Sequence, residues 1–252
     1  MMSPQEELAS RLVHAGPAGL SFADLPAGLV PADAQAAYAV QAHVLALRQS
    51  GIAGWKVGSK TPTGPIQGAP LPADGVHASP ATLMRAAFRP LALELEIAFR
   101  FGEDFAPRSA PYADEQVFAA LSHMAATIEV VSSRYQEWPG VDRLAQLADL
   151  QNHGALVVGE AVPYRAGYPY LAPSLSFTFN GADIAASPAA NPAGDPRRLL
   201  PWVVNHCRAH GITLQAGTWI TGGSYTGMHF PATPGTARGS FDGLPPVALT
   251  LA

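Results

Sequence analysis

One segment constrains the fold of this chain more than any other, because large apolar side chains alternate along it with small or charged ones: 91–101, LALELEIAFRF. Side chains of a β-strand point alternately to its two faces, so the alternation predicts a strand with one continuous apolar face. Glu94 and Glu96 are neighbours on the other face, with Cα atoms about 7 Å apart. Two carboxylates at that spacing can share one hard cation, but they also suit the solvated face of an antiparallel strand. The segment alone leaves both interpretations open.

A second predicted strand, 125–134 (AATIEVVSSR), has no polar face. A strand of this kind is typically buried on both sides, which places Glu129 inside the protein. A buried carboxylate needs a compensating partner, and two remain open: an ion pair with Arg134 or a bound metal ion. Together with Glu94 and Glu96, Glu129 makes a set of three carboxylates that suits octahedral Mg²⁺ or Mn²⁺.

The composition excludes several classes of function. Only 13% of the 252 residues are charged and the net charge is −4, whereas binding to nucleic acid or to a membrane surface requires clustered Lys and Arg. No apolar run is long enough to span a bilayer, and the N-terminus lacks the pattern of a secretory signal. The single cysteine, Cys207, permits no intrachain disulfide. We therefore expect a cytoplasmic protein that binds neither nucleic acid nor membrane.

The N-terminal part is predicted to form a small helical lobe. Apolar residues recur with the helical period over 4–14 and 33–50, Asp33 can cap the second helix, and Gly51 can end it. The stretch 20–31 between the two helices is predicted to be a loop.

A short apolar strand at 52–60 carries Lys56, and a segment rich in Pro and Gly follows it at 61–80. Lys56 is either a surface lysine whose stem packs on apolar neighbours or a cation beside a carboxylate-bearing substrate. A connection that long without secondary structure is commonly a lid or a binding loop, so we expect 59–80 to cover a functional site.

Turn and capping signals predict the remaining elements. We expect helices at 114–124 and 143–149, strands at 153–159 and 247–251, a hairpin closed by Asn180-Gly181, a turn at 231–235, and a helix that Asp195-Pro196 opens and Gly211 closes. His206, Cys207 and His210 on that helix have a spacing that can hold zinc. Histidines in a last turn are also explained by the negative end of the helix dipole.

A strand that begins at Trp219 runs into a glycine-rich turn, which contains Thr221, Gly222 and Ser224. Exposed amides and hydroxyls of such a turn suit a bound carboxylate, and an ordinary turn is the alternative interpretation.

Five segments, in this order and with this spacing, resemble the 2-oxopent-4-enoate hydratase and 4-oxalocrotonate decarboxylase family of the fumarylacetoacetate hydrolase superfamily: GWKVG at 54–58, LELEI at 93–97, IEVVSSR at 128–134, Ala148-Asp149 ahead of VVG at 157–159, and ITGGS at 220–224. Each motif alone is weak, and the five in order make the resemblance specific. The resemblance implies an α+β fold, with a mostly β catalytic domain of rolled, mixed sheets over 53–252 behind a small helical N-terminal lobe over 1–52.

The resemblance also implies the site. It places a divalent metal ion, Mg²⁺ or Mn²⁺, on Glu94, Glu96 and Glu129, and an active-site lysine at Lys56, which we expect to support an oxyanion or the substrate carboxylate. Asp149 is expected to take part in catalysis by moving a proton or holding water, for which Glu129 is also a candidate. The expected substrate-binding residues are Lys60, Arg134, Thr221, Gly222 and Ser224.

Three positions depart from the family pattern. Ser132 stands where the family usually has an aspartate, Leu150 where it has an asparagine, and Lys60 where a threonine is common. The metal ligands are intact, whereas groups that orient ligands and set specificity are changed.

The implied activity is that of a hydratase, a metal-dependent carbon–oxygen lyase. It adds water to a 2-hydroxy-2,4-dienoate, after ketonisation to the 2-oxo-enoate, and gives a 4-hydroxy-2-oxo acid, as in the meta-cleavage degradation of aromatic compounds. Decarboxylation of a 2-oxo-3-enedioate is the alternative within the family, and it needs a cationic recess, for which Lys60 and Arg134 are the candidates. A catalytically quiet subunit that supports a related enzyme is a second alternative. We expect a homo-oligomer, or a complex with a related enzyme of the family.

Overall fold

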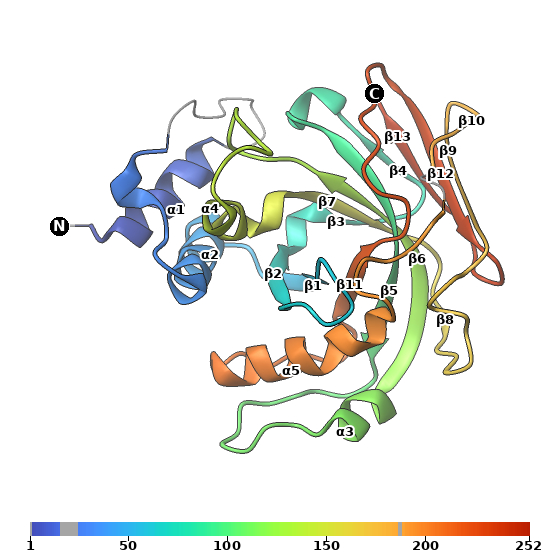
Figure 1. Ribbon diagram of the computed structural model, residues 1–252, viewed down its shortest axis with the longest axis horizontal. Coiled ribbons are helices and arrows are strands. Elements are labelled where there is room, and N and C mark those ends of the chain that lie inside the picture. The colour runs from blue at the N-terminus through green and yellow to red at the C-terminus, as the bar shows by residue number, and fades with distance from the viewer. Residues whose placement is uncertain (1, 16–24, 186–187) are drawn as a thin grey trace.

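The computed structural model describes residues 2–15, 25–185 and 188–252 (Figure 1). An eight-stranded sheet forms its centre, in the order β2-β1-β11-β5-β6-β7-β3 with β8 paired to β6. A five-stranded sheet, in the order β10-β9-β12-β13-β4, packs against this sheet on the side away from the N-terminal helices (Figure 1). The α+β, mostly β architecture of mixed sheets that the sequence predicts is confirmed.

The strands of the larger sheet are β1 Ile52–Gly58, β2 Gln67–Pro72, β3 Val76–Ala78, β5 Ala92–Phe101, β6 Leu121–Val131, β7 His153–Val158, β8 Val162–Pro163 and β11 Trp219–Ser224. Those of the smaller sheet are β4 Ala81–Leu83, β9 Leu175–Phe179, β10 Ala182–Asp183, β12 Gly235–Phe241 and β13 Val247–Leu251. The α-helices are α1 Pro4–His14, α2 Ala34–Arg48, α3 Asp114–Ala119, α4 Arg143–Ala148 and α5 Leu200–Ala209, and short 3₁₀ helices lie at 27–29, 73–75, 85–87, 150–152 and 196–199.

The long antiparallel ladder between β5 and β6 organises both the core and the site. In this ladder Glu94 lies directly opposite Glu129. The apolar face of β5 packs against the smaller sheet, where a Cβ built on Gly239 of β12 would lie 2.2 Å from Leu95 Cδ1. Only glycine permits that close approach, so the apolar face of β5 lies in the core between the sheets and its glutamates point to the other side.

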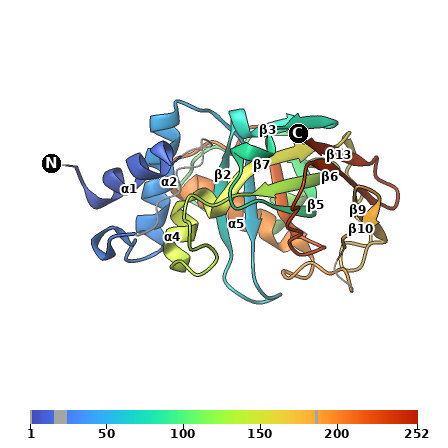
Figure 2. The same cartoon turned by 90° about the horizontal axis from the view of Figure 1, so that it is seen from above.

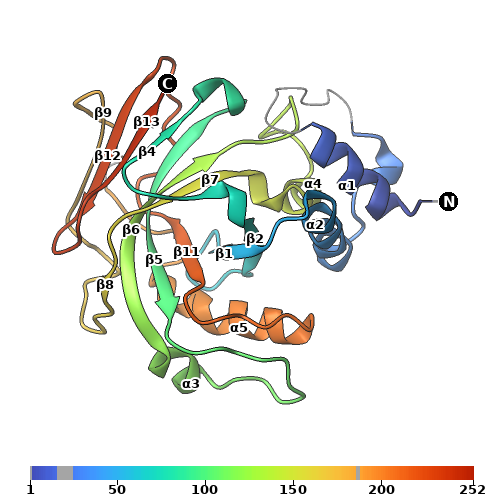
Figure 3. The same ribbon diagram turned by 180° about the vertical axis from the view of Figure 1, so that it is seen from behind.

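Three helices gather at one end of the molecule, where α2 packs on both α1 and α4 (Figures 1 and 2). Their common core includes Leu8, Val40, Val44 and Leu147. α5 lies below β1 and β11 in the rear view, with α3 beside it (Figure 3). The Asp33 side chain caps α2 as expected, since it accepts a hydrogen bond of 2.8 Å from the amide of Ala36.

Several expected boundaries differ from the structure. α2 ends at Arg48 because Gln49 takes the left-handed conformation (φ 51°), so Gly51 is not its stop. The helix expected at 114–124 ends at Ala119, since Leu121 already pairs with Phe101. The segment 231–235 leads into β12, which the sequence analysis missed.

The sequence analysis expected a long loop without secondary structure at 59–80. The structure corrects this, because most of the segment forms β2, a 3₁₀ turn and β3. Only 59–66 connects β1 to β2, and Arg198 holds this loop by donating to the carbonyls of Thr61 (2.9 Å) and Gly64 (3.1 Å). Part of the loop expected at 20–31 lies outside the described residues.

Within the described residues, no helix combines the length and the apolar character that crossing a membrane requires.

The packing of β5 predicts the effect of shortening its core face. We expect Leu95→Ala to lower the free energy of unfolding by about 3 kcal/mol, because it leaves a cavity between the two sheets. Denaturant unfolding followed by circular dichroism measures this loss. The matched control is Leu171→Ala, at a side chain that is 67% exposed, and it should change stability by less than about 0.5 kcal/mol. Equal effects of the two substitutions would contradict the proposed packing.

Candidate metal centre

Three glutamates from β5 and β6 converge on one point. One carboxylate oxygen from each of Glu94, Glu96 and Glu129 lies within 4.8 Å of the others, and no other group of three acidic, His or Cys side chains in the described residues is close enough to hold a metal ion. Glu96 and Glu129 are 2% and 1% exposed, whereas Glu94 is partly exposed. The spacing of two on β5 and the pairing of Glu94 with Glu129 together bring the three carboxylates to the same face.

Polar groups from neighbouring strands hold two of the carboxylates. The Lys56 ammonium on β1 forms a buried ion pair with Glu129. Glu96 accepts hydrogen bonds from the Thr221 hydroxyl and, at 3.2 Å, from the amide of Gly223, both on β11. The carboxylates are therefore oriented before any ligand arrives.

The negative charge of this cluster exceeds what its partners compensate. Burial, with the nearby Glu129 carboxylate, raises the pKa of Glu94 to about 7. Burial and the two neighbouring carboxylates raise the pKa of Glu96 to about 8. Burial also acts on Glu129, but the Lys56 ammonium outweighs it, with help from His153, so that the pKa of Glu129 is lowered. Three oxygen donors with one compensating lysine fit a hard divalent cation.

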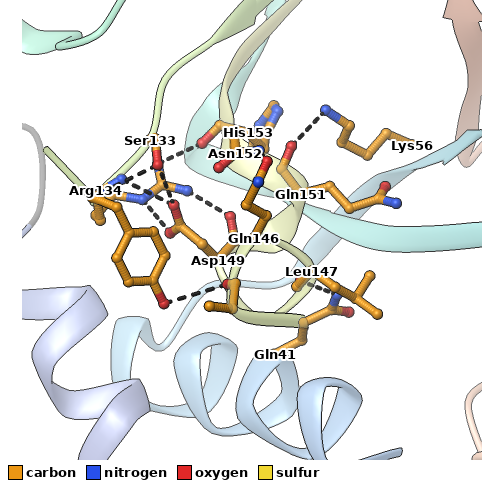
Figure 4. Close-up of polar contacts among 12 residues, drawn as sticks. Gln41, Lys56, Ser133, Arg134, Gln146, Leu147, Asp149, Gln151, Asn152 and His153 are labelled. Atoms are coloured by element: carbon orange, nitrogen blue, oxygen red, sulfur yellow. Dashed lines mark hydrogen bonds and ion pairs between the residues drawn. The ribbon is translucent and has the colours of Figure 1, made fainter. Parts of the chain in front are cut away.

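Lys56 is itself held by an unusual turn. Its ammonium donates a hydrogen bond of 3.0 Å to the carbonyl oxygen of Gln151 (Figure 4). Leu150, Gln151 and Asn152 all have positive φ, at 47°, 53° and 58°. Consecutive left-handed residues other than glycine are strained, and such strain persists where the surroundings impose it, often at functional sites. No signal in Leu-Gln-Asn predicts this turn.

The three glutamates and Lys56 line a cavity of about 880 Å³. The 59–61 loop, Gly223, Ser224 and the 138–141 loop line the same cavity. Lys60 lies in its wall as expected, and Arg143 at the start of α4 contributes a second cation that the sequence analysis missed. Arg143 was not recognised because it lies outside every motif and approaches the site only through the position of α4.

The expected site residues Arg134 and Asp149 do not line this cavity, which differs from the sequence analysis. Arg134 forms a buried ion pair with Asp149, and its guanidinium also donates 2.7 Å hydrogen bonds to the carbonyls of Asp149 and His153 (Figure 4). Arg134 and Asp149 line a separate, smaller cavity of about 270 Å³. In this geometry the pair clamps the left-handed turn.

The glycine-rich turn contributes in a different way from the one expected. Thr221 is fully buried and binds Glu96, and Gly222 presents its carbonyl to the Asn191 side chain at 2.9 Å. Gly223 and Ser224 do line the cavity. A hydrogen bond with the Ser224 hydroxyl stabilises the charged form of Glu94 and so opposes part of the rise in the pKa of Glu94 that burial causes. Of the three residues predicted here, only Ser224 lines the cavity.

The alternative zinc site on α5 is not supported. The His206 ring stacks on Trp202 at a centroid distance of 4.7 Å, and Cys207 is fully buried in the core. Burial lowers the pKa of His206 to about 4, as suits a neutral ring packed among aromatic side chains.

Comparison with known proteins gives relatives in sequence and in fold. A 2-hydroxyhexa-2,4-dienoate hydratase of Comamonas testosteroni is 28% identical over 149 residues, which cover 59% of this chain and about half (54%) of that relative. A 2-keto-4-pentenoate hydratase of Burkholderia vietnamiensis is 26% identical over 253 residues, covering 96% of this chain and 95% of the relative. No protein-family model matches the chain.

Solved structures share the fold. The 4-oxalocrotonate decarboxylase from Pseudomonas putida G7, complexed with magnesium and adipate, aligns with a TM-score of 0.82 at 18% identity, over 100% of this chain and 99% of that one. A fumarylpyruvate hydrolase from Pseudomonas aeruginosa, in complex with Mn²⁺ and pyruvate, aligns with a TM-score of 0.56 at 18% identity, over 79% and 88% of the two chains. The resemblance that the five motifs predict is confirmed: the chain is similar in sequence to two hydratases of dienoate or enoate substrates, and it shares its fold with a 4-oxalocrotonate decarboxylase.

Proposed function

We propose that this protein is a divalent-metal-dependent hydratase that converts a 2-hydroxy-2,4-dienoate, through its 2-oxo-enoate form, to a 4-hydroxy-2-oxo acid. One observation carries the proposal: three carboxylates, two of them buried, and one lysine converge in a single cavity. The names of the two sequence relatives, both hydratases of dienoate or enoate substrates, support the choice of reaction.

Glu94, Glu96 and Glu129 would hold the ion, for which we propose Mg²⁺ or Mn²⁺ because all three donors are carboxylate oxygens. An ion held there would supply Lewis-acid polarisation of the carbonyl of a 2-oxo acid.

The protein side chains supply orientation and charge. The Lys56 ammonium lies beside the carboxylate cluster, where its positive charge stabilises the substrate carboxylate and the enolate oxygen that develops during ketonisation. Its pKa is raised, since the three glutamates outweigh the effect of burial, so Lys56 stays protonated at neutral pH. The walls of the cavity would orient the substrate for protonation at the far carbon and addition of water at C4.

Decarboxylation of a 2-oxo-3-enedioate is the second candidate, because it passes through the same enolate. The specific observation in its favour is the pair of cations in the cavity wall, Lys60 and Arg143, which suit a second carboxylate. A catalytically quiet subunit is disfavoured, since a cluster of three carboxylates, two of them buried, is costly to keep without a function.

The reaction is tested by following the loss of dienoate absorbance, with and without added Mg²⁺ or Mn²⁺, for mono- and dicarboxylic substrates. We expect metal-dependent hydration of a monocarboxylic dienoate. Release of carbon dioxide from a dicarboxylic substrate would favour the decarboxylase instead. Absence of turnover with every substrate and both metals would leave the quiet subunit.

The raised pKa values predict how metal binding depends on pH. Between the ordinary glutamate pKa of 4.5 and values of about 7 and 8, Glu94 and Glu96 bind more protons in the folded than in the unfolded protein. The stability of the metal-free protein therefore falls as the pH rises from about 5 to about 8, and a bound dication removes this penalty. Glu129, with its lowered pKa, stays ionised over this range. Scanning calorimetry should show a larger Mn²⁺-induced rise in Tm at pH 8 than at pH 6.

The control for this prediction is Glu96→Gln, which removes a ligand and a titrating group while keeping the size of the side chain. This variant should lose most of the Mn²⁺-induced rise in Tm. A rise of equal size at both pH values, or one that survives Glu96→Gln, would contradict the assignment of the three glutamates.

The position of Lys56 predicts a loss of catalysis without a loss of fold. We expect Lys56→Ala, assayed with saturating Mn²⁺, to lower kcat/KM about 100-fold, because one donor to the developing oxyanion is removed. The bound ion should compensate Glu129, so the Tm should stay within a few degrees of wild type. Lys56→Arg keeps the charge and changes its geometry, and an intermediate activity is expected. A fall in Tm in proportion to the lost activity would make Lys56 a structural residue.

The two cations in the wall predict a selective effect. Lys60→Thr and Arg143→Gln should each lower kcat/KM for a dicarboxylic substrate about fivefold relative to a monocarboxylic one, because each removes one exposed charge near the far carboxylate. Steady-state assays on both substrates, at low and high salt, measure the ratio. An unchanged ratio would remove Lys60 from the list of specificity residues.

A further inference from the structure

The outer end of the cavity carries an unusual group of apolar side chains, here called the apolar mouth: Trp138, Val141, Met228 and Phe230. Trp138, Val141 and Met228 line the same cavity as the three glutamates. Phe230 packs on Trp138 at a ring-centroid distance of 6.1 Å. Met228 is 45% exposed and Phe230 54% exposed, in contrast to the buried glutamates at the inner end.

Two separate loops bring these side chains to the mouth. Met228 precedes His229, whose backbone pairs with Leu93 through hydrogen bonds of 2.8 and 3.0 Å, next to Glu94. Trp138 and Val141 lie on the loop between β6 and α4, which begins a few residues beyond Glu129. Both loops therefore leave the sheet at the end where the carboxylates lie.

The mouth is braced. The Gln146 side chain donates to the carbonyls of Pro139 (3.1 Å) and Val141 (2.9 Å), so its own carbonyl must face Asn152, whose amide donates to it at 3.2 Å. On the other side, Arg85 donates to the carbonyl of Pro231 at 3.0 Å. An apolar wall whose supporting backbone is held in this way offers a fixed surface to a ligand.

The composition of the wall indicates its ligand. Exposed cations such as Lys60 and Arg143 are normal on any protein surface, whereas exposed large apolar side chains that gather from two loops need a reason. The cavity, at about 880 Å³, is near the upper end of the range for small-molecule sites and exceeds what a five-carbon acid fills. A 2-oxo acid held at the glutamates by its charged end would point its other end outward.

We propose that the apolar mouth is a subsite for an apolar substituent on the substrate, at the end remote from the carboxylate. This inference rests on the proposed function and adds its substrate class: 2-hydroxy-2,4-dienoates that carry an alkyl or aryl group larger than methyl on the terminal carbon. The inner end of the cavity binds by charge and the outer end by apolar contact, so the substrate is a monocarboxylate with an extended apolar tail.

The test is a series of dienoates with hydrogen, methyl, propyl, phenyl or carboxylate at the terminal carbon, assayed with saturating Mn²⁺. We expect kcat/KM to rise about fourfold for each added methylene until the mouth is filled, as for transfer of a methylene out of water. Met228→Ala and Trp138→Ala should lower the ratio of kcat/KM for the propyl and unsubstituted substrates about tenfold. The matched control, Leu171→Ala, removes an exposed apolar side chain outside the cavity and should leave this ratio unchanged.

Binding measurements separate this proposal from the proposed function. Calorimetry on the Mn²⁺-loaded protein should give at least tenfold tighter binding of 2-oxooctanoate than of 2-oxobutanoate, and Met228→Ala should remove most of the difference. Turnover without a dependence on the tail overturns the subsite and leaves the hydratase. Tail-dependent binding without turnover of any dienoate overturns the hydratase and leaves the subsite.

The same side chains could instead form a contact between two copies of the chain, and light scattering distinguishes this outcome. If Met228→Ala or Phe230→Ala lowers the mass of the assembly and leaves the selectivity ratio unchanged, the subsite is overturned. If Trp138→Ala does not fold, Met228→Ala, at a half-exposed side chain, still decides.

Discussion

The site depends on one buried ion pair, between Lys56 and Glu129. Three carboxylates lie within 4.8 Å of one another on the central strands, and one lysine can compensate only one of them. Glu129 therefore stays ionised, while Glu94 and Glu96 have pKa values raised to about 7 and 8. Two further positive charges would compensate the ionised forms of Glu94 and Glu96. This is the physical basis for assigning the cluster to a divalent cation.

The position of Lys56 explains the strained turn below it. Left-handed residues other than glycine cost on the order of 1 kcal/mol or more each, and three occur in succession here. Arg134 offsets this cost, because it is paired with Asp149 before the turn and bonded to the carbonyl of His153 after it. The turn thereby presents the Gln151 carbonyl to the Lys56 ammonium. Arg134 and Asp149, which the sequence analysis expected to bind substrate and take part in catalysis, thus support the turn that holds Lys56.

The sequence predicted the parts of this structure that follow from side-chain period and local capping. Alternation along 91–101 predicted β5 and placed Glu94 and Glu96 on one face, and Asn180-Gly181 predicted the turn between β9 and β10. β2 was missed because its sequence, QGAPLP, contains two prolines, which an edge strand tolerates. The left-handed turn and the approach of Arg143 were not predictable, since tertiary contacts impose both.

The brace connects the left-handed turn to the apolar mouth. Gln146 connects the loop of Trp138 to Asn152, and Asn152 belongs to the same left-handed turn whose Gln151 carbonyl holds Lys56. Three hydrogen bonds therefore connect the mouth to Lys56: one from Gln146 to the 138–141 loop, one from Asn152 to Gln146, and one from Lys56 to the Gln151 carbonyl. An oxyanion is stabilised only by a donor at the correct position. Under the proposed function, a substrate that fits the mouth poorly would therefore lose twice: in its own binding and in the placement of Lys56.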